Sequence, residues 1–169
     1  MRPVLLNLAV SLDGFIEDAA GRFDWCFTDQ DYGMTDFLAR IDAILMGRKS
    51  YELLISMGED PFPQPKKYVF SNTLNAVNDP YLLIRGDAAE MVRSMKAEPG
   101  KAMWLFGGAQ FNQAIANAGL VDEYILSVHP ILLGSGKPVF TGLNTRIPLR
   151  LLRAETYSSG LVQLSYCPE

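Results

Sequence analysis

Residues that bind metals or form disulfides are scarce in this sequence. Among 169 residues there is one histidine, and the two cysteines, Cys26 and Cys167, lie far apart. Their separation matches neither a zinc-ligand spacing nor a disulfide framework, so we expect no metal ion and two reduced thiols.

Long apolar runs and an excess of positive charge are also missing. No segment reaches the roughly 18 apolar residues of a membrane span, and the apolar run at 4–10 is interrupted by Asn7 and lacks a cleavage site of small residues. The net charge of −4 leaves no broad basic surface for nucleic acid. We therefore expect a cytoplasmic protein whose partner is a small molecule rather than a nucleic acid or a membrane.

Two common nucleotide-binding motifs are absent as well. The chain contains neither the Gly-x-Gly-x-x-Gly fingerprint nor a phosphate loop ending in Gly-Lys-Ser/Thr. Their absence disfavours an ordinary Rossmann domain and a nucleoside triphosphatase.

What the chain does contain is typical of one α/β domain, which we expect to span residues 1–169. Hydrophobic residues make up 49% and charged residues 20%, an ordinary balance for a globular protein. Short apolar runs predict buried strands, and patterns of helical period separate many of them. The predicted strands are 4–10, 43–47, 67–71, 81–84, 102–106 and 123–133.

Three predicted helices follow a strand and a glycine corner, at Gly47, Gly86 and Gly107-Gly108, and a fourth, weaker one covers 35–41. Helical spacing predicts which side chains of the first and third of these helices face the core. They are Tyr51, Leu54 and Ile55 in the first, and Phe111, Ala114, Ile115 and Ala118 in the third.

The last third of the chain changes character. The segments after residue 123 show no helical period and are joined by turn-forming residues at 134–136 and 158–160. They predict antiparallel strands, with Pro130 at an edge or a bulge. The expected fold is therefore a mixed, mostly parallel central sheet with helices on both faces and antiparallel C-terminal strands.

The glycine corners are candidate anion sites. Ligands of open α/β sheets bind at the carboxyl ends of strands, where a helix N-terminus offers unpaired N–H groups that suit phosphate. Glycine has no Cβ, so an anion or a flat ring can approach the main chain. The alternative is that these glycines only serve the turns.

Neighbouring residues favour the anion-site interpretation. Arg48 and Lys49 follow Gly47, and Ser71 and Asn72 follow another strand. Two cations with hydroxyl and amide groups would suit a phosphorylated ribose. Taken singly, Arg48 and Lys49 are better explained as solvated surface residues.

These pieces, in this order, resemble the dihydrofolate reductase-like superfamily. The branch they resemble most is the C-terminal reductase domain of the bifunctional riboflavin-biosynthesis deaminase-reductases (RibD), including its stand-alone relatives. The matching stretches are SLDGFI (11–16), ILMGRKSYE (44–52), YVFSN (68–72), WLFGGAQ (104–110) and VDEYILSVHPILLGSGKPVF (121–140).

The resemblance implies a dihydrofolate reductase-like fold and a reductase that binds NADPH. Carried over by position, Gly47, Arg48 and Lys49 would meet the adenosine phosphate region. Ser71 and Asn72 would lie by the 2′-phosphate or its ribose. Main-chain N–H groups for the pyrophosphate would come from Gly107, Gly108, Ala109 and Gln110.

One departure concerns the 2′-phosphate. Dihydrofolate reductases usually carry a third glycine and then a basic residue at the last corner, where this chain has Ala109 and Gln110. One cation is thereby missing, so the expected preference for NADPH over NADH rests on Arg48 and Lys49.

Asp13 is the candidate catalytic and substrate-binding residue. It precedes Gly14 after the first strand, and the resemblance places the matching aspartate at the substrate site, near the nicotinamide. The alternative is a purely structural turn. Trp25 and Tyr51 are candidate walls of the substrate pocket, or they belong to the core.

Two further residues have open roles. Asp31 lies near the position of the acid that binds the pteridine in dihydrofolate reductases, but its surroundings do not match, and a solvated loop is the alternative. His129 precedes Pro130 at a strand bend, where it serves either the structure or proton transfer.

The resemblance implies hydride transfer from NADPH to a carbonyl or imine of a small polar or heterocyclic substrate. That substrate would resemble a pteridine or a riboflavin precursor, as for a 5-amino-6-(5-phosphoribosylamino)uracil reductase. A role in riboflavin biosynthesis itself stays open, because the chain lacks the deaminase half and its zinc signature. The alternative is a non-catalytic nucleotide- or ligand-binding protein on the same fold. By analogy we expect a homodimer that pairs through the late strands.

Overall fold

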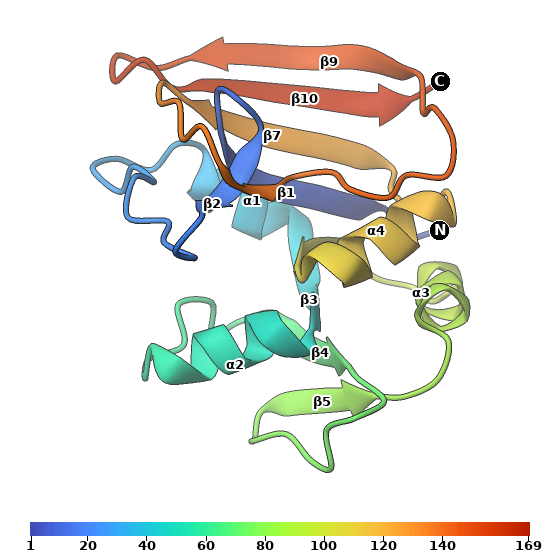
Figure 1. Ribbon diagram of the computed structural model, residues 1–169. Helices are drawn as coiled ribbons and strands as arrows, with labels where there is room; N and C mark the ends of the chain where they lie inside the picture. The colour runs from blue at the N-terminus through green and yellow to red at the C-terminus, as the bar shows by residue number, and fades with distance from the viewer.

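The computed structural model describes all of residues 1–169. Its main strands are β1 (Val4–Ser11), β3 (Ile41–Gly47), β4 (Lys66–Phe70), β5 (Tyr81–Ile84), β6 (Ala102–Gly107), β7 (Glu123–His129), β9 (Leu149–Thr156) and β10 (Val162–Pro168). They form one sheet in the order β5-β4-β3-β6-β1-β7-β10-β9 (Figure 1). A small second sheet pairs β2 (Phe15–Asp18) with β8 (Gly136–Pro138).

The sheet is mixed in the way the sequence predicts. The five strand pairs between β5 and β7 are parallel, whereas β10 runs antiparallel to both β7 and β9. The predicted strand 123–133 is shorter than expected, because β7 ends at His129, directly before Pro130. Proline lacks the N–H that would continue the ladder.

Helices cover both faces of the sheet, as expected. They are α1 (Met34–Arg40), α2 (Arg48–Ser56), α3 (Ala88–Ala97) and α4 (Ala109–Asn117). Because side chains alternate along a strand, Leu5 joins the apolar cluster under α1 and α2, whereas Val4 and Leu6 join the cluster under α3 and α4.

Two of the predicted inward positions are wrong. Ile55 of α2 and Ala114 of α4 are exposed, while Asn112 and Ala116 of α4 are buried. The inward stripe of α4 is therefore rotated from the predicted one. The apolar pattern of a short helix does not show which polar residue the rest of the fold will cover.

The strands β1 and β6 part before they end. Their pairing runs only from Val4↔Met103 to Leu6↔Leu105, although β1 stays paired with β7 as far as Ser11. A gap therefore opens between residues 7–9 of β1 and residues 106–108 at the end of β6. This gap lies at the carboxyl edge of the sheet, where open α/β sheets bind ligands.

The helices have seven to ten residues each, too few for any of them to cross a bilayer.

Candidate cofactor and substrate site

A cavity of about 760 Å³ lies over the gap between β1 and β6. Its lining includes Asn7, Leu8 and Ala9 on one side and Phe106, Gly107 and Gly108 on the other. The rest of the wall comes from the starts of α2 and α4, from the loop 23–33, and from parts of β2, α1, β7, β8, β9 and β10. The volume is that of a site for a whole small molecule rather than for a single ion.

At one end of the cavity two helix N-termini meet through glycine. A Cβ on Gly108 would lie 3.3 Å from Cα of Gly47, and a Cβ on Gly107 would lie 2.9 Å from Oγ of Ser50. Gly108 also has a φ of 94°, which side-chain-bearing residues rarely adopt. Glycine is thus required here to bring the starts of α2 and α4 together.

This end of the cavity is suited to an anion. Neither Gly47 nor Gly108, the N-caps of α2 and α4, provides a side-chain cap, so the first N–H groups of both helices have no intrahelical partner. Lys49, Ser50 and Ala109 line the cavity beside them. Two helix dipoles, a cation and a hydroxyl therefore converge on one place.

Other predicted cofactor residues lie outside the cavity wall. Gln110 is exposed, and Arg48 forms a surface ion pair of 2.8 Å with Glu52. Because Gly47 pairs with Phe70, the residues that follow them, Arg48 at the start of α2 and Ser71 after β4, leave adjacent strand ends.

Ser71 and Asn72 organise the loops at this edge. The Ser71 hydroxyl accepts the N–H of Leu74 at 3.1 Å. The Asn72 side chain bonds both main-chain groups of Gly86, accepting from its N–H at 2.8 Å and donating to its carbonyl at 3.3 Å. These contacts join the ends of β4 and β5 into one surface beside the start of α2.

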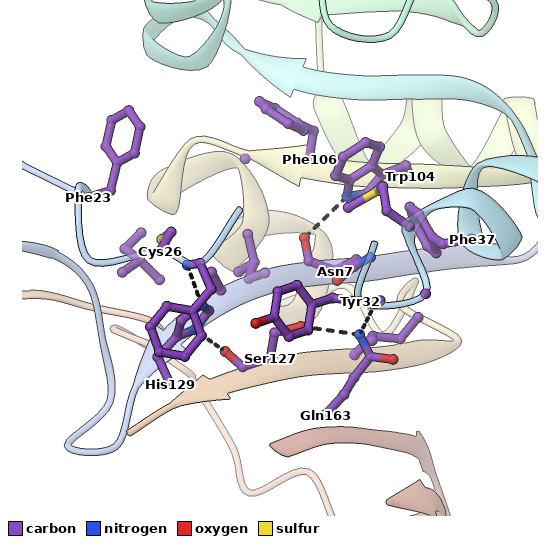
Figure 2. A pocket seen from close by; sticks show the side chains of 18 of the residues that line it. Asn7, Phe23, Cys26, Tyr32, Phe37, Trp104, Phe106, Ser127, His129 and Gln163 are labelled. Atoms are coloured by element: carbon purple, nitrogen blue, oxygen red, sulfur yellow. Dashed lines mark hydrogen bonds between the residues drawn. The ribbon is translucent and has the colours of Figure 1, made fainter. Parts of the chain in front are cut away.

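The other end of the cavity has aromatic walls and a neutral polar floor. Phe37, Trp104 and Phe106 line it above, as seen in Figure 2, and Ser127 and Gln163 lie below. Asn7 lies between these groups, and its side-chain amide makes no hydrogen bond within the protein. A flat heterocycle with polar edges would find both stacking surfaces and hydrogen-bonding groups here.

The loop 23–33 covers this end of the cavity, and Tyr32 lies near the end of that loop. Tyr32 has a φ of 49°, which is unusual for a bulky residue, and its ring packs edge-on against Tyr157 with centroids 4.9 Å apart. Gln163 Nε2 donates to the Tyr32 carbonyl at 3.3 Å and to Ser127 Oγ at 3.2 Å (Figure 2). The side-chain amide of Gln163, on β10, thus holds the loop in a strained conformation.

His129 holds the middle of the same loop. Its Nε2 accepts the N–H of Phe27 at 3.1 Å, so the proton must be on Nδ1, which donates to the Ser127 carbonyl at 2.9 Å. Burial lowers the pKa of His129 below its ordinary value. The ring is therefore neutral and structural, with no free nitrogen for general-base work.

Cys26 lines the cavity but is a poor nucleophile. Burial, with a smaller contribution from nearby Asp24, raises the pKa of the Cys26 thiol to about 11. A thiol of this kind stays protonated and contributes an apolar surface rather than covalent chemistry.

The structure does not bring Asp13 to the cavity. Its carboxylate accepts hydrogen bonds from Ser11 Oγ at 2.7 Å, Gly134 N at 2.7 Å and Leu133 N at 3.1 Å, and these bonds, the first above all, lower the pKa of Asp13. Asp13 is absent from the lining and ties the turn after β1 to the segment after β7. This geometry matches the structural-turn alternative.

Trp25, Tyr51 and Asp31 also have structural positions. Tyr51 is buried in the core under α2, and its hydroxyl accepts the N–H of Asn78. Trp25 packs edge-on against His129 and does not line the cavity. Asp31 accepts hydrogen bonds from the N–H and the hydroxyl of Thr35 at the start of α1, so it caps that helix at the cavity rim.

Sequence reasoning missed the polar floor made by Asn7, Ser127 and Gln163. Asn7 left a signal, since it interrupts an otherwise apolar strand. Ser127 and Gln163 left none, because a polar residue in a strand with one exposed face is ordinary. Only the pairing of β7 with β10 places them side by side.

Comparison with known proteins agrees with this architecture. A dihydrofolate reductase from Enterococcus faecalis complexed with NADP(H) superposes with a TM-score of 0.73 at 13% identity, over 99% of this chain and 96% of that one. A putative riboflavin biosynthesis protein from Shewanella sp. PV-4 gives a TM-score of 0.88 at 26% identity, over 100% and 99%. The fold class is thus dihydrofolate reductase-like.

Residues 2–163 match the RibD C-terminal domain, and the chain belongs to that family. The uncharacterized protein YyaP of Bacillus subtilis (strain 168) is 46% identical over 177 residues, which cover 98% of this chain and 94% of that protein. The chain therefore matches this relative over nearly the full length of both.

The neutral state of His129 makes stability depend on pH. Because the folded-state pKa of His129 lies below the unfolded value, its stabilisation is complete above about pH 6.5 and is lost as the pH falls toward the folded-state pKa. We expect urea-unfolding free energies to fall between about pH 7.5 and 5.5, by at most about 1.4 kcal/mol per pH unit. His129→Gln should flatten this dependence, and an equally steep profile in that variant would contradict the assignment.

Proposed function

We propose that the protein is an NADPH-dependent reductase that transfers hydride to a carbonyl or imine of a small heterocyclic compound of the pyrimidine or pteridine type. One observation carries the proposal: a single cavity joins an anion-binding end to an aromatic-walled polar end through the gap between β1 and β6. A dinucleotide and a flat substrate need these two environments in contact. Membership of a reductase family supports the same conclusion.

The anion-binding end fits a diphosphate. The N–H groups of Gly108, Ala109 and Gln110 at the start of α4 would donate to it, together with Lys49 and Ser50 at the start of α2. The close contact of Gly47 and Gly108 leaves no side chain between these donors. This geometry supports the expected role of Gly107 and Gly108 in binding the pyrophosphate through main-chain N–H groups.

The residues at the rim beside the anion-binding end would recognise the 2′-phosphate. Arg48 supplies a guanidinium at the start of α2, and Ser71 and Asn72 supply polar groups on the adjacent strand end. The partner of Arg48 is an exposed glutamate, and surface ion pairs of this kind are weak enough to exchange for a phosphate.

The substrate end positions a neutral heterocycle and excludes water. NADPH supplies the hydride, so the protein must hold the acceptor carbon close and in register with it. Aromatic rings provide the walls, and Asn7, Ser127 and Gln163 provide donors and acceptors for a polar edge. Asp13 acts here through the turn that it closes rather than by touching the substrate.

A charge placed at the start of α4 tests the diphosphate site. Asp at the first helical position is tolerated or stabilising, because it complements the helix dipole, but it would repel a diphosphate. We expect NADPH to raise the melting temperature of the wild type. Ala109→Asp should bind NADPH more than about tenfold more weakly, measured by calorimetric titration, while keeping its thermal stability.

Gln110→Asp is the matched control. It adds the same charge one residue later, at an exposed position outside the cavity wall, and should weaken binding less. Equal NADPH affinities of Ala109→Asp and the wild type would contradict the placement of the diphosphate at the start of α4. NADPH binding without oxidation in the presence of any carbonyl or pteridine compound would instead favour a non-catalytic binding protein.

Arg48→Ala tests the choice between the two cofactors. Loss of the guanidinium should weaken NADPH about tenfold and leave NADH nearly unchanged, because only NADPH carries the 2′-phosphate. Dissociation constants for both nucleotides provide the measurement. Equal losses for NADPH and NADH would assign Arg48 to another role.

We also propose that the protein forms a homodimer through β9. This strand is the last of the sheet, its outer edge has no partner strand, and Leu149, Leu151 and Leu152 on it are exposed. A second copy would present the same apolar edge, and such self-complementary pairing would cover the open edge of β9 in both copies. Arg153 and Glu155 of β9 line the cavity, so the interface would adjoin the substrate end.

The two edges of the sheet provide a matched test of the dimer. Leu152 on β9 and Leu82 on β5 are both 47% exposed. We expect Leu152→Glu to weaken the dimer by more than about tenfold in sedimentation equilibrium, whereas Leu82→Glu leaves it intact. A monomeric wild-type protein would contradict the proposal.

A further inference from the structure

The cations of the cavity wall are nearly all paired with carboxylates. The lining contains Arg40, Lys49, Lys137 and Arg153, and three of these four form ion pairs. The pairs are Lys137–Glu17, Arg153–Glu155 and Arg40–Glu123. Lys49 has no carboxylate partner, but it lies at the start of α2 and already belongs to the proposed diphosphate site. No unpaired cation is therefore left for the rest of the cavity.

Two further carboxylates give the rest of the wall an excess of negative charge. Asp31 and Asp36 line the cavity, and neither is paired with a cation. Hydrogen bonds from Thr35, that of its hydroxyl above all, hold the pKa of Asp31 below its ordinary value, so Asp31 is ionised at neutral pH. Because each ion pair is neutral as a unit, these two aspartates set the sign of the local charge.

The start of α1 offers no replacement for the missing cations. Asp31 accepts the Thr35 N–H at 3.0 Å and the Thr35 hydroxyl at 2.6 Å, so the protein's own carboxylate occupies this helix start. Glu155 lies nearby. The Tyr157 hydroxyl donates to Glu155 at 3.3 Å, and it would lie 3.6 Å from a Cβ on Gly33, the N-cap of α1. Two carboxylates therefore flank the start of α1.

Opening the ion pairs would not create a phosphate site. The carboxylate partners of Lys137 and Arg153 line the cavity themselves, so a phosphate that took either cation would still face the displaced carboxylate. The rim beside the diphosphate end differs, because Glu52, the partner of Arg48, is not part of the wall. A phosphate monoester carries a charge of about −2 at neutral pH, so the surplus of negative charge would repel it.

We propose that the substrate is an uncharged pyrimidine or pteridine without a phosphate group, and that the carboxylates of the cavity wall select against phosphorylated compounds. This inference rests on the proposed function and names the substrate class of the same site. The neutral polar floor of the cavity hydrogen-bonds the heterocycle, while Glu17 and Glu155 neutralise cations that would otherwise attract a phosphate. A phosphorylated riboflavin precursor is then a poor ligand, and its dephosphorylated form is a good one.

Two pairs of probes that differ only by a phosphate test this selection. They are 5-amino-6-(ribitylamino)uracil with its 5′-phosphate, and 7,8-dihydroneopterin with its 3′-phosphate. Calorimetric titration of the wild type saturated with NADP+ should show that the uncharged member of at least one pair binds more than about tenfold more tightly than its phosphate. Raising the ionic strength from about 0.1 M to about 1 M should reduce this preference, because its origin is electrostatic.

Removing the two carboxylates should reverse the selection. The double variant Glu17→Gln, Glu155→Gln keeps the shape of both side chains and leaves Lys137 and Arg153 without partners. It should bind the phosphorylated probes more than about tenfold more tightly than the wild type does, and the uncharged probes within about threefold of the wild type. Each single variant should give part of this gain.

A matched control removes the same charge elsewhere. Glu90 of α3 and Glu98, the C-cap of that helix, are exposed and lie outside the cavity wall. The double variant Glu90→Gln, Glu98→Gln should therefore keep the preference of the wild type for the uncharged probes. A loss of preference in this control would assign the effect to the net charge of the protein and would overturn the inference.

The remaining outcomes distinguish this inference from the proposed function. If NADPH binds but the phosphorylated probes bind as tightly as their uncharged partners, the inference is overturned and the reductase proposal stands. An unchanged preference in Glu17→Gln, Glu155→Gln would overturn it too, because the carboxylates would not be the cause. If NADP+ binds but none of the probes does, the inference fails together with the proposed substrate class. If no nucleotide binds, the whole proposed function fails with it.

Discussion

The close approach of Gly47 and Gly108 is the constraint on which the site depends. Two helices that begin at neighbouring strand ends can direct their N–H groups at one point only if nothing projects between them. The absence of a Cβ meets that condition, and the positive φ of Gly108 starts α4 at the required angle. The tight turn, which was the alternative explanation for the glycine pair, is therefore compatible with the proposed anion site, because the same turn brings the two helix starts together.

Because β1 and β6 separate before they end, the cavity beside Gly47 and Gly108 extends into the sheet. In a fully paired sheet, residues 7–9 and 106–108 would be joined by ladder hydrogen bonds and would leave no gap. The continued pairing of β1 with β7 and of β3 with β6 keeps both sides rigid. A cavity bounded by strands and helix starts holds its shape better than one bounded by loops.

One wall is nevertheless a loop, and buried neutral groups hold it. His129 accepts the Phe27 N–H, and Gln163 donates to the Tyr32 carbonyl, so the middle and the end of the loop are tied to β7 and β10. Neutral groups suit this task, because burying a charge at the base of the cavity would cost more than burying a paired amide. The end of the cavity proposed for the substrate therefore offers neutral polar groups, and its charged residues form pairs such as Glu17–Lys137 and Arg153–Glu155.

The sequence by itself determined the parallel strands of the main sheet, the helix starts and the glycine corners. These follow from period, from apolar runs and from residues that act on their own backbone, all of which are local properties. It did not determine which polar side chains reach the cavity. Asp13 was expected at the substrate site and closes a turn, while Gln163, for which the sequence predicted no role, lines the cavity. Only the tertiary structure decided this, because a side chain's surroundings depend on which strands become neighbours, and a strand's own pattern does not encode its neighbours.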